Sequence, residues 1–376
     1  MKGKPLFSAA IPAMGQAEFI STAMESVKAQ KSAVELAVLD ATPDESVQKA
    51  LEPYGGMIAY GYHRPDGGQA AAIQEGWANT SGSIVFWLNA DDYLFPGALD
   101  EVARVFEAEP ETDVVFGHGV YVYPDCGFMM YFPAIDPDVS RLVKGSVIHQ
   151  PSCFVRRQAM AKVGGLDTSL KYTMDWDFWL RLYRAGCVFR FLDKPLSAAR
   201  IYPETKTLRG SDRRYREMAR LLAPSTGPIG RALFTLKYRA FDAVSQEGGI
   251  FNRAVSLAGG AAIAAKDWLS HKEPIYGLGR WSNTVQDRCR VFLPWFSATA
   301  PSEMLAEVSS GAQISISVNG QAVETSSAPT NPVRFLGREM ASDAVTARLP
   351  DTGAGVLEFE IRSNAGKFRL YSLRAR

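Results

Sequence analysis

Strand-like and helix-like segments alternate along the first third of the chain. Apolar, β-rich residues predict strands at Leu6–Ile11, Val34–Leu39, Met57–Tyr62 and Ile84–Leu88, and a further strand beginning at Val114–Phe116. Helical spacing of apolar residues predicts helices at Glu18–Lys28, Asp44–Leu51, Gln69–Ala78 and Pro96–Glu107. Because strands joined by helices form mostly parallel sheets, the pattern predicts an α/β fold of the doubly wound kind.

Polar residues stand where two of these strands end. Asp40 follows the second predicted strand, and Asn89–Asp92 follows the fourth, whose continuous apolar run indicates burial on both faces. In doubly wound sheets, ligands bind outside the carboxyl ends of the strands. We therefore expect Asp40 and Asn89–Asp92 to lie at a ligand site.

The overall charge excludes one broad class of function. Lys and Arg number 41 and Asp and Glu number 40, so the chain of 376 residues has a formal net charge of +1. A dedicated nucleic-acid binder needs a basic excess for its phosphate contacts, and no nucleic-acid partner is expected. No apolar run approaches the roughly 20 residues of a membrane-spanning helix, and the four cysteines lack metal-ligand spacing, as is typical of a cytoplasmic protein.

The later part of the chain predicts further elements and domains. Residues 140–225 combine strands at Ser152–Val155 and Val188–Leu192 with helices at Arg157–Val163 and Met174–Arg184. After about residue 276, short alternating strands and an Asn319-Gly320 turn predict a small β-sandwich. We place the domain boundaries at 1–222 for an α/β domain, 223–275 for a helical basic linker and 276–376 for the β-sandwich.

The linker region is locally basic. Residues 200–239 hold ten Lys or Arg and three acidic residues, and Leu233, Leu236 and Phe241 form an apolar helical stripe. Such a helix can dock on an anionic membrane surface. It can equally pack on the α/β domain with its basic residues in solvent, and both interpretations stay open.

Three short motifs carry the candidate chemistry, and each has a structural alternative. In Asn89-Ala90-Asp91-Asp92, adjacent carboxylates suit a divalent cation, or one of them caps the following helix. In His63–Gln69, the glycines let backbone approach a ligand at a helix start, or they form a plain turn. In Asp175-Trp176-Asp177, a carboxylate between tryptophans suits a general base, or the acids complement the helix dipole.

In this order and spacing, the motifs resemble the inverting glycosyltransferases of family 2, which have the GT-A fold, a mixed sheet flanked by helices. The resemblance covers about residues 5–210 and rests on five successive blocks. They are HRPDGGQAAAIQEGW, GSIVFWLNADDYLFPGALDEV, HQPSCFVRR, GGLDTSLKYTMDWDFWLRL and ARIYPETKT.

The resemblance implies a role for particular residues on the donor side. Pro12 and Asp40 would contact the base and ribose of a nucleotide sugar, most simply a UDP-sugar. The rest of the nucleotide-sugar site would comprise Asp66, Gly68, Gln69, Asn89, Asp91, Arg200 and Lys206. Arg200 and Lys206 would neutralise the leaving diphosphate, and Asp92, with Asp91, would hold Mn²⁺ or Mg²⁺ on it.

On the acceptor side, the resemblance implies Asp175 as the base that deprotonates the acceptor hydroxyl, with Gln150 and Trp176 shaping the acceptor site. The implied activity is inverting transfer of a sugar to a glycan or polyprenyl-linked acceptor in cell-surface polysaccharide biosynthesis. The implied place is the cytoplasm, peripheral on the inner face of the plasma membrane.

Two other functions are weighed against this one. Tyr202 stands where many relatives have His, and Met174 replaces a common acid, which leaves open a degenerate transferase that serves as a glycan-binding or assembly scaffold. A nucleotidyltransferase would need a Gly-rich phosphate loop with a basic residue after the first strand, and IPAMGQAEF does not supply one.

Overall fold

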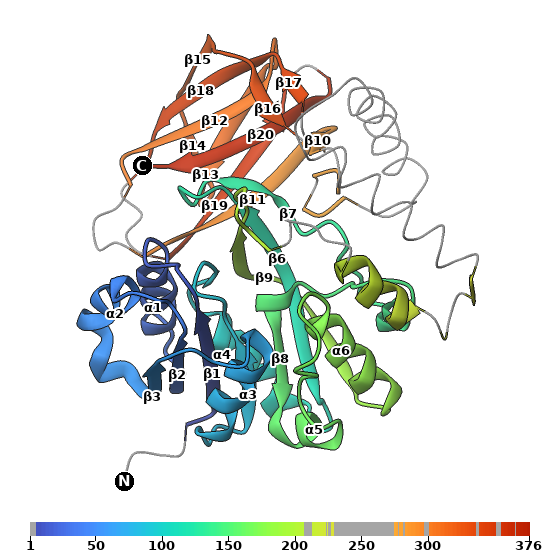
Figure 1. The fold of residues 1–376 in the computed structure, drawn as a ribbon. Helices are drawn as coiled ribbons and strands as arrows, with labels where there is room; N and C mark the ends of the chain where they lie inside the picture. The colour runs from blue at the N-terminus through green and yellow to red at the C-terminus, as the bar shows by residue number, and fades with distance from the viewer. Residues whose placement is uncertain are drawn as a thin grey trace. The chain divides into compact units, whose positions relative to one another are not determined.

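The computed structural model divides the chain into two compact units, which are described separately (Figure 1). The first unit comprises Met1–Gly119, Ala134–Ala199 and Ser211–Arg231, and the second comprises Val120–Pro133, Arg200–Gly210 and Ala232–Arg376. The structure describes residues 5–206, 213–222, 224, 227–228, 274–276, 278–280, 283–296, 301–335, 338–350, 355–364 and 366–376.

A mixed sheet forms the centre of the first unit. Its strand order is β6-β8-β4-β1-β2-β3. The strands are β1 (Phe7–Ala13), β2 (Val34–Asp40), β3 (Ile58–His63), β4 (Ile84–Trp87), β6 (Val114–Val122) and β8 (Cys153–Arg156). Strands β1 to β4 pair in parallel, whereas β8 runs antiparallel to both β4 and β6. The predicted mixed α/β fold is therefore confirmed.

The helices of this unit agree closely with the periodicity of the sequence. They are α1 (Ile20–Lys28), α2 (Ser46–Leu51), α3 (Gln69–Ala78), α4 (Ala98–Ala108), α5 (Arg157–Lys162) and α6 (Met174–Arg184), with 3-10 turns η1 (Glu52–Met57), η2 (Val139–Val143) and η3 (Gln150–Ser152). The bounds of α3 and α6 are those predicted. Strand β5 (Tyr93–Leu94) pairs with β9 (Phe189–Arg200), which is much longer than the predicted strand Val188–Leu192.

Close packing holds helix α3 against the sheet. A Cβ atom on Gly76 would lie 2.9 Å from Leu39 and 3.1 Å from Ala10, so the absent side chain lets the helix approach β1 and β2. On the same helix, Trp77 packs edge-on against Trp87 of β4, with ring centroids 5.7 Å apart. Phe178 of α6 adds to this cluster at 6.5 Å from Trp87. Helices α3 and α6 are thus joined to β4 by one buried aromatic cluster.

The second unit consists of antiparallel strands. One sheet has the order β15-β18-β12-β20-β7, with β10 beside β20, and another has the order β11-β19-β13-β14. The strands are β7 (Phe128–Tyr131), β10 (Thr284–Val285), β11 (Arg288–Trp295), β12 (Glu303–Ser309), β13 (Ile314–Val318), β14 (Gln321–Val323), β15 (Thr325–Pro329), β18 (Ser342–Arg348), β19 (Gly355–Ser363) and β20 (Phe368–Ala375), with a separate pair of β16 (Val333–Phe335) and β17 (Arg338–Met340).

Two sequence predictions for this unit are confirmed. Alternate residues are buried along β11 and β19, as a β-sandwich requires. The turn between β13 and β14 has φ of 48° at Asn319 and 81° at Gly320, the two positive values of a type I′ hairpin turn. Strands β12 and β18 were not predicted.

A hairpin from the first half of the chain also belongs to the second unit. The end of β6 pairs with β7, and β7 in turn pairs with β20 through Phe128 and Leu373. The Nε of Arg374 lies 2.7 Å from Asp125 Oδ2 in the turn of this hairpin. The domain boundaries at 222 and 275 stay a prediction, since most of 223–273 lies outside the described residues, as do Leu233, Leu236 and Phe241. Among the residues described, no helix is both long and apolar enough to cross a lipid bilayer.

Gly82, just before β4, offers a test of this packing. A Cβ atom there would lie 2.4 Å from the carbonyl carbon of Phe7 and 2.6 Å from the nitrogen of Ser8, and backbone atoms of a central strand have little room to move. We expect Gly82→Ala to lower the free energy of unfolding by about 1–3 kcal/mol, measured by urea denaturation. Gly55→Ala is the control, since nothing lies within 4 Å of its Cβ position. Equal stabilities of the two variants would contradict the prediction.

His149, which precedes η3, gives the first unit a pH-dependent stability. Its ring is buried, with Nδ1 3.3 Å from the hydroxyls of both Ser152 and Ser197, and burial lowers its pKa to about 3. Below about pH 6.5 the unfolded chain binds a proton here that the folded protein does not, so stability falls as the pH falls, by up to about 1.4 kcal/mol per pH unit.

His149→Asn removes this titration while keeping a polar group beside the two hydroxyls. We expect the wild type to lose about 2 kcal/mol more than the variant between about pH 7 and pH 5, measured as urea midpoints at each pH. Parallel pH profiles for the two proteins would show that His149 does not carry the effect.

Candidate functional site

The sequence-predicted residues of the first unit gather where its parallel strands end. Asp40 is the last residue of β2, Pro12 lies near the end of β1, and Asn89–Asp92 follow β4. Parallel neighbours β4, β1 and β2 have their carboxyl ends at one edge of the sheet. This edge is the candidate site.

Four side chains form a hydrogen-bonded group here, which we call the amide cluster: Gln69, Asn89, Asp92 and Gln150. The amide nitrogen of Gln69 donates to Asn89 Oδ1 at 2.7 Å. The amide nitrogen of Asn89 donates to Asp92 Oδ2 and to Gln150 Oε1, each at 2.9 Å. The structure thus brings together residues that the sequence assigned separately to the donor, metal and acceptor sides.

The amide cluster is fixed to the sheet. Gln150 donates to the carbonyl oxygen of Trp87, the last residue of β4, at 2.9 Å. The backbone N–H of Asp92 donates to the carbonyl oxygen of Asn89 at 3.0 Å. Because Asn89 contacts three segments, its position joins the start of α3, the turn after β4 and η3.

The adjacent carboxylates Asp91 and Asp92 differ in exposure. Asp92 is 4% exposed and accepts the hydrogen bond from Asn89, whereas Asp91 is only partly buried. In the described part of the chain, no group of three or more His, Cys, Asp or Glu side chains could hold a metal ion. Mg²⁺ at phosphate-transfer sites commonly uses one or two carboxylates together with substrate phosphates and water. A metal role for Asp91 and Asp92 therefore stays a prediction.

Asp40 is held by a full set of polar partners. Its side chain is 0% exposed and accepts the N–H of Thr42 at 2.9 Å and the amide of Gln48 at 3.1 Å. His63 Nδ1 lies 2.7 Å from its second oxygen. His63 and Gln48 were not assigned roles from the sequence, although His63 belongs to the motif at 63–69. Asp40 therefore ties the ends of β2 and β3 together at this edge.

Asp66 shapes the entrance to α3. Its Oδ1 accepts the N–H of Gly68 at 2.7 Å, and its Oδ2 accepts the hydroxyl of Tyr62 at 3.2 Å. Burial and the Asp66 charge raise the pKa of Tyr62, so this hydroxyl stays protonated. Gly68 has φ of 99°, which favours glycine, and it directly precedes Gln69, the first residue of α3. The turn thereby sets the position of Gln69 in the amide cluster.

Asp175 is the second residue of α6. Its Oδ1 accepts the N–H of Trp176 at 2.7 Å, and its side chain is partly buried. Trp176 is 2% exposed, and its ring N–H donates to the carbonyl oxygen of Leu142 in η2 at 2.7 Å. Trp176 thus anchors the start of α6 in the interior.

Two observations relate Asp175 to the amide cluster. Phe178, one helical turn after Asp175, packs on Trp87, which is two residues before Asn89. The pKa of the buried Cys153 thiol is raised, chiefly by burial and in part by the charge of Asp175. Cys153 lies three residues after Gln150. The start of α6 and the amide cluster therefore lie in one neighbourhood of the first unit.

Arg200 and Lys206, assigned to the leaving diphosphate, lie in the second unit. Arg200 is buried, and its guanidinium donates to the carbonyl oxygen of Pro124 at 3.2 Å and to Cys126 Sγ at 3.0 Å. Lys206 is exposed. Their role toward a diphosphate stays a prediction.

Comparisons with known proteins identify the family of the segment that holds most of this sheet. Residues 8–163 match the model of the family described as Glycosyl transferase family 2. An uncharacterized glycosyltransferase of Rickettsia typhi is 28% identical over 195 residues, covering 49% of this chain and 61% of the relative. The O-antigen biosynthesis protein RfbC of Myxococcus xanthus is 33% identical over 148 residues, covering 39% of this chain and 11% of that protein.

The solved structure of TarS residues 1–349 from S. aureus, in complex with UDP-GlcNAc, is 15% identical, with a TM-score of 0.48 over 65% of this chain and 68% of that chain. The chain spans less than two thirds of the Rickettsia typhi relative. The match at residues 8–163, together with the mixed sheet and its flanking helices, shows that the chain carries a glycosyl transferase family 2 domain of the GT-A fold.

Proposed function

We propose that the protein transfers a sugar from a nucleotide-diphosphate sugar to a hydroxyl of a glycan or polyprenyl-linked acceptor, with inversion at the anomeric carbon. The observation that carries this proposal is the amide cluster, in which donor-side and acceptor-side residues meet beside the helix that holds Asp175. A role in cell-surface polysaccharide biosynthesis is supported by the relative named for O-antigen biosynthesis. We place the reaction at the cytoplasmic face of the plasma membrane, because the basic excess of residues 200–239 would favour anionic lipid.

On the donor side, Pro12 and Asp40 would contact the base and ribose, and Asp66, Gly68, Gln69 and Asn89 would line the nucleotide. Asp91 and Asp92 would hold Mn²⁺ or Mg²⁺. Such an ion, when bound, neutralises charge that develops on the leaving diphosphate.

On the acceptor side, Asp175 would accept the proton of the attacking hydroxyl. The acceptor oxygen forms a bond to the anomeric carbon from the face opposite the diphosphate, and the bond to the diphosphate oxygen breaks with its electron pair. An α-linked donor then gives a β-linked product. Gln150 would orient the acceptor, and Trp176 would keep the start of α6 in place.

Replacement of the base tests this mechanism. Asp175→Asn should lower kcat by about 100-fold or more, because general-base catalysis contributes roughly 10²–10⁴, while the Kd for nucleoside diphosphate stays unchanged. Asp177→Asn is a matched control on the same helix, since it breaks the 2.7 Å ion pair with Arg181 outside the proposed chemistry. Normal turnover by Asp175→Asn would exclude Asp175 as the base.

A thermal-shift panel of nucleoside diphosphates and sugar nucleotides, with and without Mn²⁺, tests the donor site. We expect one nucleoside diphosphate to raise the Tm, since a ligand at about 100 times its Kd stabilises by about 2.7 kcal/mol. Asp92→Asn should remove the part of the shift that depends on Mn²⁺. No shift with any nucleotide would contradict the proposed donor class, and binding without turnover would favour a scaffold.

A further inference from the structure

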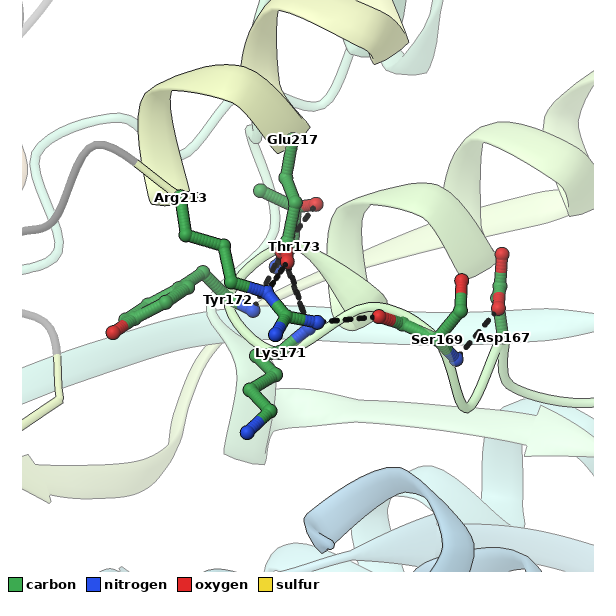
Figure 2. A network of polar contacts seen from close by, with 7 residues as sticks. All are labelled: Asp167, Ser169, Lys171, Tyr172, Thr173, Arg213 and Glu217. Atoms are coloured by element: carbon green, nitrogen blue, oxygen red, sulfur yellow. Dashed lines mark hydrogen bonds and ion pairs between the residues drawn. The ribbon is translucent and has the colours of Figure 1, made fainter.

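Glu217 is a buried carboxylate on helical residues 213–222, beyond the segment that matches the family model. It is 3% exposed. Figure 2 shows its side chain directed at the loop before α6. It accepts the backbone N–H groups of three consecutive residues, at 3.1 Å from Lys171, 2.8 Å from Tyr172 and 3.3 Å from Thr173.

These three donors lead directly into α6. Thr173 is the residue before the helix, and its side chain does not cap the helix in the usual way. Its hydroxyl lies 3.5 Å from Glu217 Oε2 instead. Because one rigid carboxylate holds three successive N–H groups, it restricts the backbone dihedrals of Lys171–Thr173, and these determine where the first turn of α6 begins.

Arg213 completes the network one helical turn before Glu217. Its Nε donates to Glu217 Oε1 at 3.0 Å, and its Nη2 donates to the carbonyl oxygen of Ser169 at 2.9 Å (Figure 2). Ser169 in turn donates its N–H to Asp167 at 2.8 Å. The helical residues 213–222 therefore hold the loop at two places, Ser169 and Lys171–Thr173.

The charge of Glu217 is maintained despite its burial. Burial raises the pKa of this carboxyl, but the N–H groups of Tyr172 and Lys171 and the Arg213 guanidinium lower it to a net value below the usual range. At neutral pH the group is an acceptor only, which suits three N–H donors. A glutamine in its place would offer one oxygen and turn an NH₂ group toward the remaining donors.

We propose that Glu217 is a positioning residue for Asp175. This inference rests on the proposed function, in which Asp175 is the base. Asp175 lies two residues after Thr173, and its short side chain follows the backbone of the first helical turn. A displacement of about 1 Å at a reacting group can cost about 100-fold in rate. Glu217 acts on the reaction through the loop and touches no reacting atom.

Glu217→Gln is the test, with Glu101→Gln as the matched control, because Glu101 of α4 pairs with Lys194 at 2.8 Å and Arg104 at 2.7 Å in the same unit. The number of nucleotide-binding sites in each preparation is measured by titration with the nucleoside diphosphate that gives the largest thermal shift. This number allows kcat to be expressed per folded, nucleotide-binding molecule. We expect Glu217→Gln to lower kcat per binding site by about tenfold or more, with the nucleotide Kd within about twofold. Amide hydrogen exchange at Lys171–Thr173 should become faster by about tenfold or more. Glu101→Gln should leave all three quantities unchanged.

Arg213→Gln removes the ion pair with Glu217 and the bond to the Ser169 carbonyl, but it leaves in place the three N–H donors that bind Glu217. We expect its kcat per site to fall by less than about threefold. An equal loss in Arg213→Gln and Glu217→Gln would overturn the role of the loop hydrogen bonds.

A merely structural role would reduce the number of nucleotide-binding sites and leave kcat per site unchanged, and that result would overturn the proposal. If Glu217→Gln does not fold, Glu217→Asp serves instead: its carboxylate is one methylene shorter, and kcat per site should fall by about threefold or more. Unchanged kcat per site in that variant would overturn the role. Absence of transfer by the wild type would overturn the proposed function, and with it this role, whereas an active wild type with a fully active Glu217→Gln would overturn the role of Glu217 alone.

Discussion

The hydrogen bonds of Asn89 are the interaction on which the rest of the site depends. Its amide group accepts from Gln69 and donates to both Asp92 and Gln150, so one side chain satisfies partners from three separate segments. Removal of its side chain would take one hydrogen bond from each of Gln69, Asp92 and Gln150, which is costly because a poorly exposed polar group cannot fully replace that bond with one to water. The same bonds set the distances between Gln69, Asp92 and Gln150 at the sheet edge.

Carboxylates that accept backbone N–H groups are a recurring means of fixing loops in the first unit. Asp40 accepts from Thr42, Asp66 from Gly68, and Glu217 from Lys171, Tyr172 and Thr173. At Glu217, which is buried, the N–H donors and Arg213 favour the ionised form and hold the pKa of the carboxyl below its usual range. The loops at the sheet edge are thus held by polar contacts, while the aromatic cluster of Trp77, Trp87 and Phe178 holds the helices.

Tertiary contacts assign the two ends of strand β6 to different units. Strand β6 begins in the sheet of the first unit, yet its last residues pair with β7 among the strands of the second. Within that unit, Tyr131 donates its hydroxyl to the carbonyl oxygen of Arg290 at 3.0 Å, and Asn283 donates to that of Met129 at 2.6 Å. These partners are more than 150 residues apart in the sequence. Nothing in the composition of residues 120–133 distinguishes them from their neighbours in the chain. The domain boundaries predicted from the sequence therefore left these residues within the α/β domain, 1–222.

The sequence by itself determined the parallel half of the first sheet, the bounds of α3 and α6, and the Asn319-Gly320 turn, because periodicity and turn chemistry act over a few neighbouring residues. Motifs in the sequence also identified Asn89, Gln150 and Asp175 as candidate site residues. Only the tertiary structure decided that β8 inserts antiparallel between β4 and β6, that His63 and Gln48 pair with Asp40, and that Glu217 meets a loop 44–46 residues away. Those outcomes depend on which distant segments pack together, and a hydrogen bond between distant residues leaves no local pattern along the chain.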